Sequence, residues 1–382
     1  MAPGVIYLDH HATTPCAGAV VEAMAPWWSD HCGNPSSRSH RPGLEVAAAV
    51  ELARSQIATA LGVQASGVVF TSGATEANNL AIKGLAEAEL RSGGPRRKLV
   101  CLSTEHRAVL DPLRYLASHG FELITLQPRR DGLVDLELLE GALDESTLLL
   151  SVMAANNEIG VLQPLASIAE LCQKRGIRLH CDGAQAVGHI PLLPGALGLH
   201  LLSFSGHKLY GPKGIGALVV DPAVTLMPQL HGGSQEGGLR AGTLPVPLIV
   251  GLAKALELAL ADQVERSQRL GDLRDALWHQ CEQLGGVERN GAASPRLAHN
   301  LNVTVQGVDG AALHRTLRRE LAVSSGSACS SGEPSHVLQA LGRSRQEAAA
   351  SIRFGLGRGT SSADISRAVA LLRHCVETLR RP

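Results

Sequence analysis

Between residues 68 and 181 the sequence repeats one pattern, in which a short apolar run gives way to small or polar residues and then to a segment of helical length. The runs are largely apolar on both faces, which is typical of strands in a parallel sheet that helices cover on both sides. We therefore predict an α/β fold with a mostly parallel central sheet. The runs assigned to strands are residues 68–70, 98–102, 121–126, 148–153 and 177–181.

Polar side chains gather where these runs end. In sheets of this kind, ligands bind in the crevice at the carboxyl ends of the strands. Because several polar segments fall at such ends, this coincidence is the strongest physical signal of a functional site in the chain. The segments are residues 71–76, 103–106, 156–158 and 182–185.

The last third of the chain has a different character. A long helix with exposed charges is predicted over residues 247–284, and the alternating segment, helices and strand that follow are typical of a smaller α+β unit. A chain of 382 residues, 45% of them apolar, can bury two cores. We predict a large domain over residues 15–260 and a small α+β domain made of residues 1–14 and 261–382, which carries a loop with Cys329.

Composition argues against several classes of protein. The formal net charge is zero and 3% of residues are aromatic, so we expect neither nucleic-acid nor membrane-surface binding. No apolar stretch approaches the roughly 18 residues of a transmembrane helix, and residues 1–9 lack a signal-peptide pattern. The 8 cysteines are scattered, without CxxC or zinc spacing, which predicts reduced thiols in a cytoplasmic protein and no metal site.

Lys208 is the first candidate catalytic residue. It lies in a glycine-punctuated corner, residues 205–214, between apolar runs at residues 197–204 and 215–220. A lysine that is held between two strands and stripped of water has a lowered pKa and can form a Schiff base with an aldehyde. The alternative is a surface turn with a solvated lysine.

Other strand-end residues supply what a Schiff-base lysine would need. Pyridoxal phosphate requires an acid for its ring nitrogen, a platform over the ring and donors for its phosphate. Asp182 could be the acid, His106 could stack on the ring, and Gln185 could bond the ring oxygen. The alternatives are an ordinary turn aspartate and a structural or solvated histidine.

A phosphate site is predicted where residues 72–75 separate a strand from a helix. Backbone N–H groups and the Thr75 hydroxyl could bind an anion there. Ser205 and His207, which flank the lysine, could complete the site. A simple helix N-cap is the alternative.

Two further residues could act on a substrate. Cys329 lies in a loop of small residues, 324–332, which has little bulk to bury a thiol, so it is a candidate nucleophile once ionised. Arg353, on a predicted strand, could bind a carboxylate through two hydrogen bonds. The alternatives are a structural cysteine and a surface salt bridge.

Taken together and in this order, these residues resemble the NifS/IscS-type cysteine desulfurases, which are fold-type I, class-V aminotransferase-like pyridoxal phosphate enzymes. Each matching segment is a weak signal alone, whereas the ordered set is highly specific. The resemblance runs from Tyr7 to about Thr360 and implies a large domain with a mixed, mostly parallel sheet between helices. The matching segments are residues 7–9, 33–37, 71–79, 104–106, 156–160, 182, 185, 205–208, 240–245, 324–329 and 351–358.

The resemblance implies a role for each candidate. Lys208 would bind the cofactor aldehyde and later move the substrate's Cα proton, Asp182 would pair with the pyridine nitrogen, and His106 would stack on the ring and take part in acid–base steps. Gln185 would contact the phenolic oxygen. The residues implied in phosphate binding are Ala74, Thr75, Ser205, His207 and, acting on the neighbouring subunit's phosphate, Thr243.

The implied reaction is the removal of sulfur from L-cysteine, which gives L-alanine and a persulfide on Cys329. Asn157 would contact cofactor and substrate, and Arg353 would hold the substrate carboxylate. The implied partners are a second copy of the chain and a protein that accepts sulfur for iron–sulfur cluster assembly or thiolation. A selenocysteine lyase, an aminotransferase of the same fold and a catalytically silent relay subunit are the alternatives.

Overall fold

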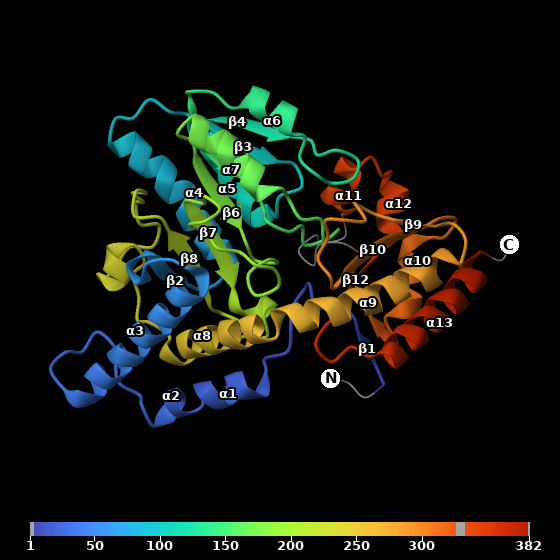
Figure 1. Ribbon diagram of the computed structural model, residues 1–382, viewed down its shortest axis with the longest axis horizontal. Coiled ribbons are helices and arrows are strands. Elements are labelled where there is room, and N and C mark those ends of the chain that lie inside the picture. The colour runs from blue at the N-terminus through green and yellow to red at the C-terminus, as the bar shows by residue number, and fades with distance from the viewer. Residues whose placement is uncertain (1–3, 326–332, 381–382) are drawn as a thin grey trace.

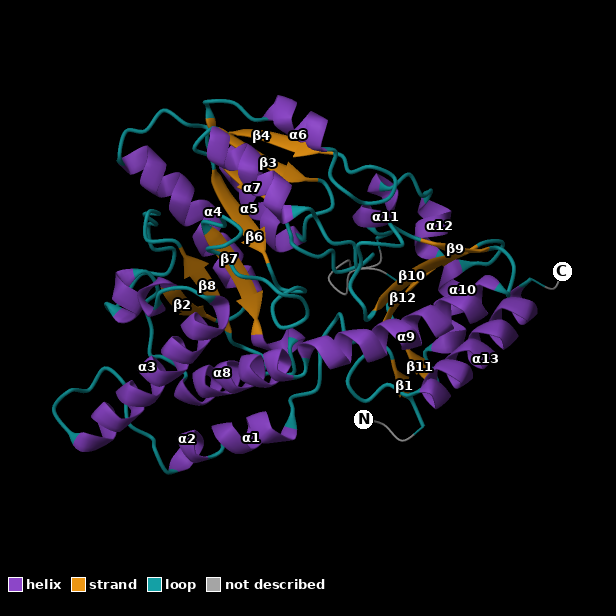
Figure 2. Cartoon of the chain, in the orientation of Figure 1, coloured by secondary structure: helices purple, strands orange, loops and turns teal. Residues whose placement is uncertain are grey.

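Seven strands form the central sheet of the computed structural model, which describes residues 4–325 and 333–380 (Figures 1 and 2). In spatial order they are β2 (Val68–Thr71), β8 (Gly216–Val220), β7 (Leu201–Ser205), β6 (Arg178–Asp182), β5 (Thr147–Ser151), β3 (Lys98–Leu102) and β4 (Glu122–Leu126). Neighbouring strands are parallel except at β8, which is antiparallel to both β2 and β7. The predicted α/β class with a mixed, mostly parallel sheet is therefore confirmed.

The antiparallel direction of β8 determines at which edge of the sheet the turn between β7 and β8 lies. Because β8 is antiparallel to both of its neighbours, β2 and β7 run in the same direction as β5 and β6. The carboxyl ends of these four strands therefore share one edge of the sheet. The turn that joins β7 to β8 contains Lys208 and lies at this same edge.

Helices cover both faces of the sheet. Successive side chains of a strand point to opposite faces, so Leu99 and Cys101 of β3 pack into one core and Val100 and Leu102 into the other. The first core is covered by α4 (Ala74–Arg91) and α5 (Arg107–Ala117), and the second by α3 (Arg41–Leu61), α6 (Leu136–Ala142), α7 (Leu165–Lys174) and α8 (Val246–Ala261). Among the described residues, no helix combines the length and the apolarity that a bilayer crossing requires.

A third core lies at the other end of the molecule and draws on both ends of the chain (Figure 1). Its antiparallel sheet has β10 (Asn300–Val305) between β9 (Val287–Arg289) and β12 (Ser351–Gly355), and β1 (Ile6–Tyr7) pairs with β11 (Leu321–Ala322). The domain boundaries near residues 14 and 260 stay a prediction. The helices of this region are α9 (Gln263–Glu282), α10 (Gly310–Leu317), α11 (His336–Ala340), α12 (Arg345–Ala349) and α13 (Ser362–Leu379).

The single helix predicted over residues 247–284 is wrong, because the chain breaks it into α8 and α9 at Asp262. This residue has φ −107° and ψ 9°, outside the helical region. Its carboxylate accepts hydrogen bonds from Arg266, one turn into α9, and from Arg358, which follows β12. The contact with Arg358 is long-range and favours the break, and residue spacing does not encode it.

The buried ion pair between Arg54 and Glu236 holds the segment between β8 and α8 against the sheet. The Glu236 side chain is 1% exposed and accepts hydrogen bonds from Arg54 Nη2 at 2.7 Å and Nη1 at 2.9 Å. It also accepts the N–H of Phe70, at 2.7 Å, and the Arg54 guanidinium lies over the Phe70 ring. Since both charges are withdrawn from water, removing one leaves the other uncompensated.

We expect Glu236→Ala to lower the free energy of unfolding by about 3–5 kcal/mol, because the buried Arg54 guanidinium loses its partner. Urea unfolding followed by circular dichroism measures the change. Glu257→Ala breaks an exposed pair with Lys254 on α8 and is the matched control, with an expected cost below about 1 kcal/mol. Equal losses in the two variants would contradict this prediction.

Candidate active site

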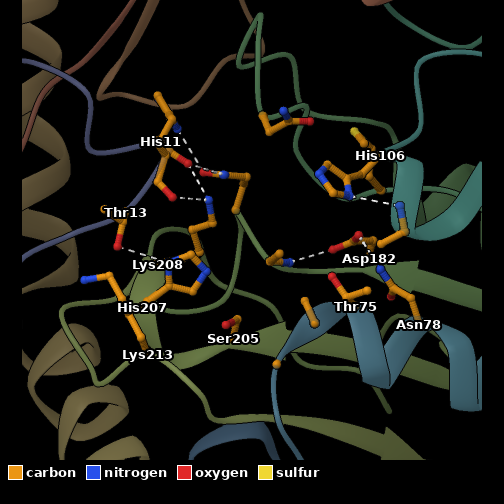
Figure 3. A pocket seen from close by; sticks show the side chains of 18 of the residues that line it. His11, Thr13, Thr75, Asn78, His106, Asp182, Ser205, His207, Lys208 and Lys213 are labelled. Atoms are coloured by element: carbon orange, nitrogen blue, oxygen red, sulfur yellow. Dashed lines mark hydrogen bonds between the residues drawn. The ribbon is translucent and has the colours of Figure 1, made fainter. Parts of the chain in front are cut away.

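A cavity of about 450 Å³ opens at the carboxyl edge of the central sheet (Figure 3). Its walls come from segments that follow β2, β3, β5, β6 and β7, from the N-terminal segment and from β12. Thr243 is exposed and does not line the cavity, and Cys329 lies outside the described residues. The candidate residues that do line it are Ala74, Thr75, His106, Asn157, Asp182, Gln185, Ser205, His207, Lys208 and Arg353.

Lys208 ends the short helical turn η2 (Gly206–Lys208), and its side chain points into the cavity (Figure 3). Its Nζ donates to the carbonyl oxygens of His11, at 2.5 Å, and Ala12, at 2.8 Å. The turn requires glycine at position 206, because a Cβ there would lie 2.9 Å from the carbonyl oxygen of Pro212. Lys208 is therefore a half-buried amine with carbonyl partners, unlike a solvated surface lysine.

Asp182 is the last residue of β6 and is 5% exposed. Its Oδ2 accepts a hydrogen bond from Asn78 Nδ2 at 2.8 Å, and its Oδ1 accepts the N–H of Ala184 at 2.9 Å. Both donors are neutral. The carboxylate thus has a fixed position in the cavity while its charge remains available to a cationic ligand.

His106 caps the start of α5 on the same side of the cavity as Asp182 (Figure 3). Its Nδ1 accepts the N–H of Ala108 at 3.1 Å, which leaves the second ring nitrogen to carry the proton. Burial lowers the pKa of His106, although the nearby Asp182 charge opposes that shift. The imidazole is therefore neutral near pH 7 and offers a ring face beside the carboxylate.

The end of the cavity nearest α4 is suited to an anion. Gly73, the N-cap residue, has φ 155°, a conformation that side chains disfavour, and no side chain in the described part of the chain caps the helix. Thr75 and Ser205 bring hydroxyl groups to this end, and the positive end of the helix dipole points the same way.

Glu76, which lies in the first turn of α4, does not cap this helix end. The Glu76 carboxylate accepts the N–H of Ser72 at 2.8 Å, a residue before the cap, and pairs with Arg240 at 2.8 Å. The first turn of the helix is thus not capped by its own acidic residue.

Arg353 lies on β12 and is 1% exposed, so it is no surface ion pair. Its Nη2 donates to Asp9 Oδ1 at 2.9 Å and its Nη1 to the carbonyl oxygen of Asn157 at 3.0 Å. Its Nε has no hydrogen-bond partner among the described residues. A buried guanidinium with an unused donor can bind a carboxylate in the cavity.

Comparison with protein families decides where this chain belongs. Residues 6–368 match the family described as aminotransferase class-V. The chain belongs to the class-V aminotransferase family. Within this family it is 45% identical over 379 residues to the cysteine desulfurase IscS of Dechloromonas aromatica and 47% identical over 381 residues to that of Aeromonas hydrophila. Each alignment covers 98% of this chain and 93% of the relative.

Solved structures agree with this family assignment. A NifS-like protein with 34% identity superposes with a TM-score of 0.92 and covers 98% of this chain and 100% of its own. SspA, solved in complex with cysteine, has 37% identity and a TM-score of 0.81 and covers 92% of this chain and 99% of its own. The resemblance to NifS/IscS-type cysteine desulfurases that the sequence suggested is confirmed.

Four polar residues that line the cavity were given no role by sequence reasoning: His11, Thr13, Asn78 and Lys213. Asn78 lies on α4, one turn beyond the polar segment at the helix start, and that spacing was an available signal. His11 and Thr13 follow the first apolar run of the chain. Thr13 Oγ1 lies 3.1 Å from His207 Nδ1, a contact between residues that are remote in sequence.

The cavity of this class-V chain fits pyridoxal phosphate. The group needs an amine for its aldehyde, a buried acid for its ring nitrogen and an anion site for its phosphate. Lys208, Asp182 and the uncapped start of α4 provide these at separate walls of one cavity (Figure 3). The buried Oδ1 of Asn78 also has no hydrogen-bond partner among the described residues, so a donor remains to be supplied there.

Buried neutral histidines predict acid sensitivity. Burial lowers the pKa of His180, His189 and His207 to about 4 and that of His11 and His299 well below the usual value. Because these pKa values are lower in the folded chain than in the unfolded chain, the unfolded chain binds more protons between about pH 6.5 and pH 4. Stability is therefore retained above pH 6.5 and lost as the pH falls through this window.

We expect the free energy of unfolding of the protein without cofactor to fall steadily from pH 7 to pH 4.5, by up to about 1.4 kcal/mol per pH unit for each such histidine. Urea unfolding at a series of pH values measures the slope. His299→Phe should reduce the slope by the share of one histidine, and His279→Gln, at an exposed position on α9, should leave it unchanged. A flat profile in the wild type would contradict the prediction.

Proposed function

We propose that this chain is a pyridoxal-phosphate-dependent cysteine desulfurase, which converts L-cysteine to L-alanine and leaves the sulfur as a persulfide on Cys329. One observation carries the proposal. A lysine amine and a buried carboxylate enter one cavity, beside a neutral histidine, in a chain that is 45–47% identical to IscS cysteine desulfurases along nearly its whole length.

The residues that would hold the cofactor are those of the sheet edge. Asp182 would pair with the ring nitrogen, His106 would stack on the ring, and Gln185 would contact the ring oxygen. When bound, the cofactor supplies an electron sink for the charge that is left at Cα when its proton is removed. The residues proposed for the phosphate are Ala74, Thr75, Ser205, His207 and, from the neighbouring subunit, Thr243.

The chain's own residues divide the remaining tasks. Lys208 Nζ moves the Cα proton, and Arg353 binds the substrate carboxylate beside Asn157. The Cys329 thiolate attacks the substrate sulfur, so that a bond between the two sulfur atoms forms while the bond from the substrate Cβ to sulfur breaks. The electron pair of the broken bond stays with Cβ, which takes a proton to become the methyl group of alanine. The substrate sulfur remains on Cys329 as a persulfide, so no external oxidant is needed.

The active unit proposed is a homodimer. Four large apolar side chains on the consecutive helices α1 (Gly18–Met24), α2 (Pro26–Ser29) and α3 are about half exposed or more. A second copy of the chain would cover them, and it would place Thr243 of each subunit near the other subunit's phosphate. The side chains are Val21, Trp28, Leu44 and Leu52.

A sulfur-accepting protein is the proposed second partner, either an iron–sulfur scaffold or a thiolation factor. SspA was solved with cysteine, and the IscS relatives are named for cysteine, which supports cysteine as the substrate here. We place the protein in the cytoplasm, because the described cysteines are all free and a sulfur-transferring thiol needs reducing conditions.

We expect purified protein supplied with pyridoxal phosphate to release alanine from cysteine, together with sulfide when a thiol reductant is present. Lys208→Ala should lower the rate by at least about a hundredfold, since the proton-transfer group is lost. Cys329→Ser should stop sulfide release but should keep the absorbance near 400 nm that pyridoxal phosphate shows when it is bound to Lys208. Lys254→Ala, on the surface of α8, is the control and should retain wild-type activity.

The products separate the alternatives. A keto acid in place of alanine would indicate an aminotransferase, and faster turnover of selenocysteine that survives Cys329→Ser would indicate a selenocysteine lyase. A wild-type protein that binds no cofactor and releases no alanine would overturn the proposal in favour of a silent subunit.

A further inference from the structure

Three histidine rings stack on one another, and the two outer residues hydrogen-bond to Lys208; we call His11, His299 and His189 the histidine column. The His11 and His299 ring centroids are 4.5 Å apart with 21° between the planes, and those of His299 and His189 are 4.4 Å apart with 25°. The three residues come from the N-terminal segment, from the residue before β10 and from the segment after β6. The column therefore joins parts of the chain that belong to different cores.

Each end of the column binds a residue of the proposed cofactor site. Gln185 Nε2 donates to the His11 carbonyl oxygen at 3.0 Å, so its Oε1 faces the ring and accepts from His11 Nδ1 at 2.9 Å. At the other end, His189 Nε2 donates to the Lys208 carbonyl oxygen at 2.9 Å. These bonds fix the tautomers of both outer rings.

The lysine is thus connected to the column twice. Its main-chain carbonyl binds the His189 ring, and its Nζ donates to the His11 carbonyl at 2.5 Å. Rings and hydrogen bonds form a closed path from the Lys208 backbone, through His299, back to the Lys208 amine. His299 is the middle ring of this path.

We infer that the histidine column is a positioning device for Lys208 and Gln185, and that His299 acts on both through ring stacking. The inference rests on the proposed function, because it assigns these two residues to the cofactor. Without the middle ring, the outer imidazoles lose a stacking surface on one face, and the amine at the far end of the path becomes less well ordered. A misplacement of about 1 Å in a reacting group can slow a reaction as much as a hundredfold.

The surroundings of the column favour neutral rings. Lys208 and Arg353 lie near His11, whereas Arg266 and Arg358 lie near His189, with His10 close to the last two rings. A proton on any ring would add a buried positive charge among these cations. A phenyl ring is always neutral and has faces on which imidazoles can stack, so phenylalanine is the conservative replacement at position 299.

The test follows the capture of pyridoxal phosphate by the protein prepared without cofactor. The rise of absorbance near 400 nm gives the rate, and borohydride reduction followed by peptide mass spectrometry locates the modified lysine. We expect His299→Ala to slow capture of the cofactor at Lys208 about tenfold. It should also shift, by about half a pH unit, the pH at which the absorbance near 400 nm reaches half of its maximum. His299→Phe should stay within about twofold of the wild type.

His314→Ala is the matched control, because His314 Nε2 bonds the Ser351 carbonyl oxygen much as His189 bonds that of Lys208, but on α10. It should leave the capture rate and the midpoint unchanged. Should His299→Ala fail to fold by circular dichroism, His299→Leu replaces it, with the same expected slowing because leucine offers no aromatic face. A folded alanine or leucine variant that behaves like the wild type, or a phenylalanine variant as slow as the alanine variant, would overturn the inference.

Failure of the proposed function gives a different result. The readout needs neither cysteine nor product, so a wild type that captures the cofactor at Lys208 but releases no alanine would reject the desulfurase and leave the column intact. A wild type that captures no cofactor at Lys208 would reject the lysine's role and the column together.

Discussion

The site depends on the direction of one strand. Because β8 runs against β2 and β7, the chain leaves β7, turns at the carboxyl edge and re-enters the sheet without crossing it. That turn carries Lys208 to the edge where β6 ends in Asp182 and where α4 begins after β2. With β8 parallel to its neighbours, a crossover would be needed, and the lysine would lose its place opposite the carboxylate.

Burial determines which side chains at this edge are charged and which are neutral. Asp182 and Arg353 are almost completely buried, and each is held by fixed hydrogen bonds. The histidines around them keep depressed pKa values because burial disfavours their charged forms. The charged side chains Asp182 and Arg353 therefore lie among neutral histidine rings. Asp182 offers a negative charge to a cationic ring nitrogen of a ligand, and Arg353 offers a positive charge to a ligand carboxylate.

The sequence was sufficient where chemistry follows local pattern. Lys208, Asp182 and His106 each stand where an apolar run ends, and the strand-end rule brings such residues to one edge. The roles of Asn78 and His11 were missed because their partners, Asp182 and Gln185, are remote in sequence; the spacing of Asn78 places it near the site but does not name its partner. The break at Asp262 was missed for the same reason, since Arg358 reaches it from beyond β12. Periodicity records which face is apolar, and it does not record which polar groups meet.

The N-terminal segment shows why such contacts matter more than their number suggests. Its carbonyl groups at His11 and Ala12 accept the Lys208 amine, and Asp9 accepts both Arg353 and the Ser324 hydroxyl. The lysine belongs to the central sheet, whereas the arginine belongs to the sheet of the third core. One short segment therefore carries hydrogen-bond partners both of the group proposed to move a proton and of the group proposed to hold the substrate. A shift of this segment would move hydrogen-bond partners of both groups at once.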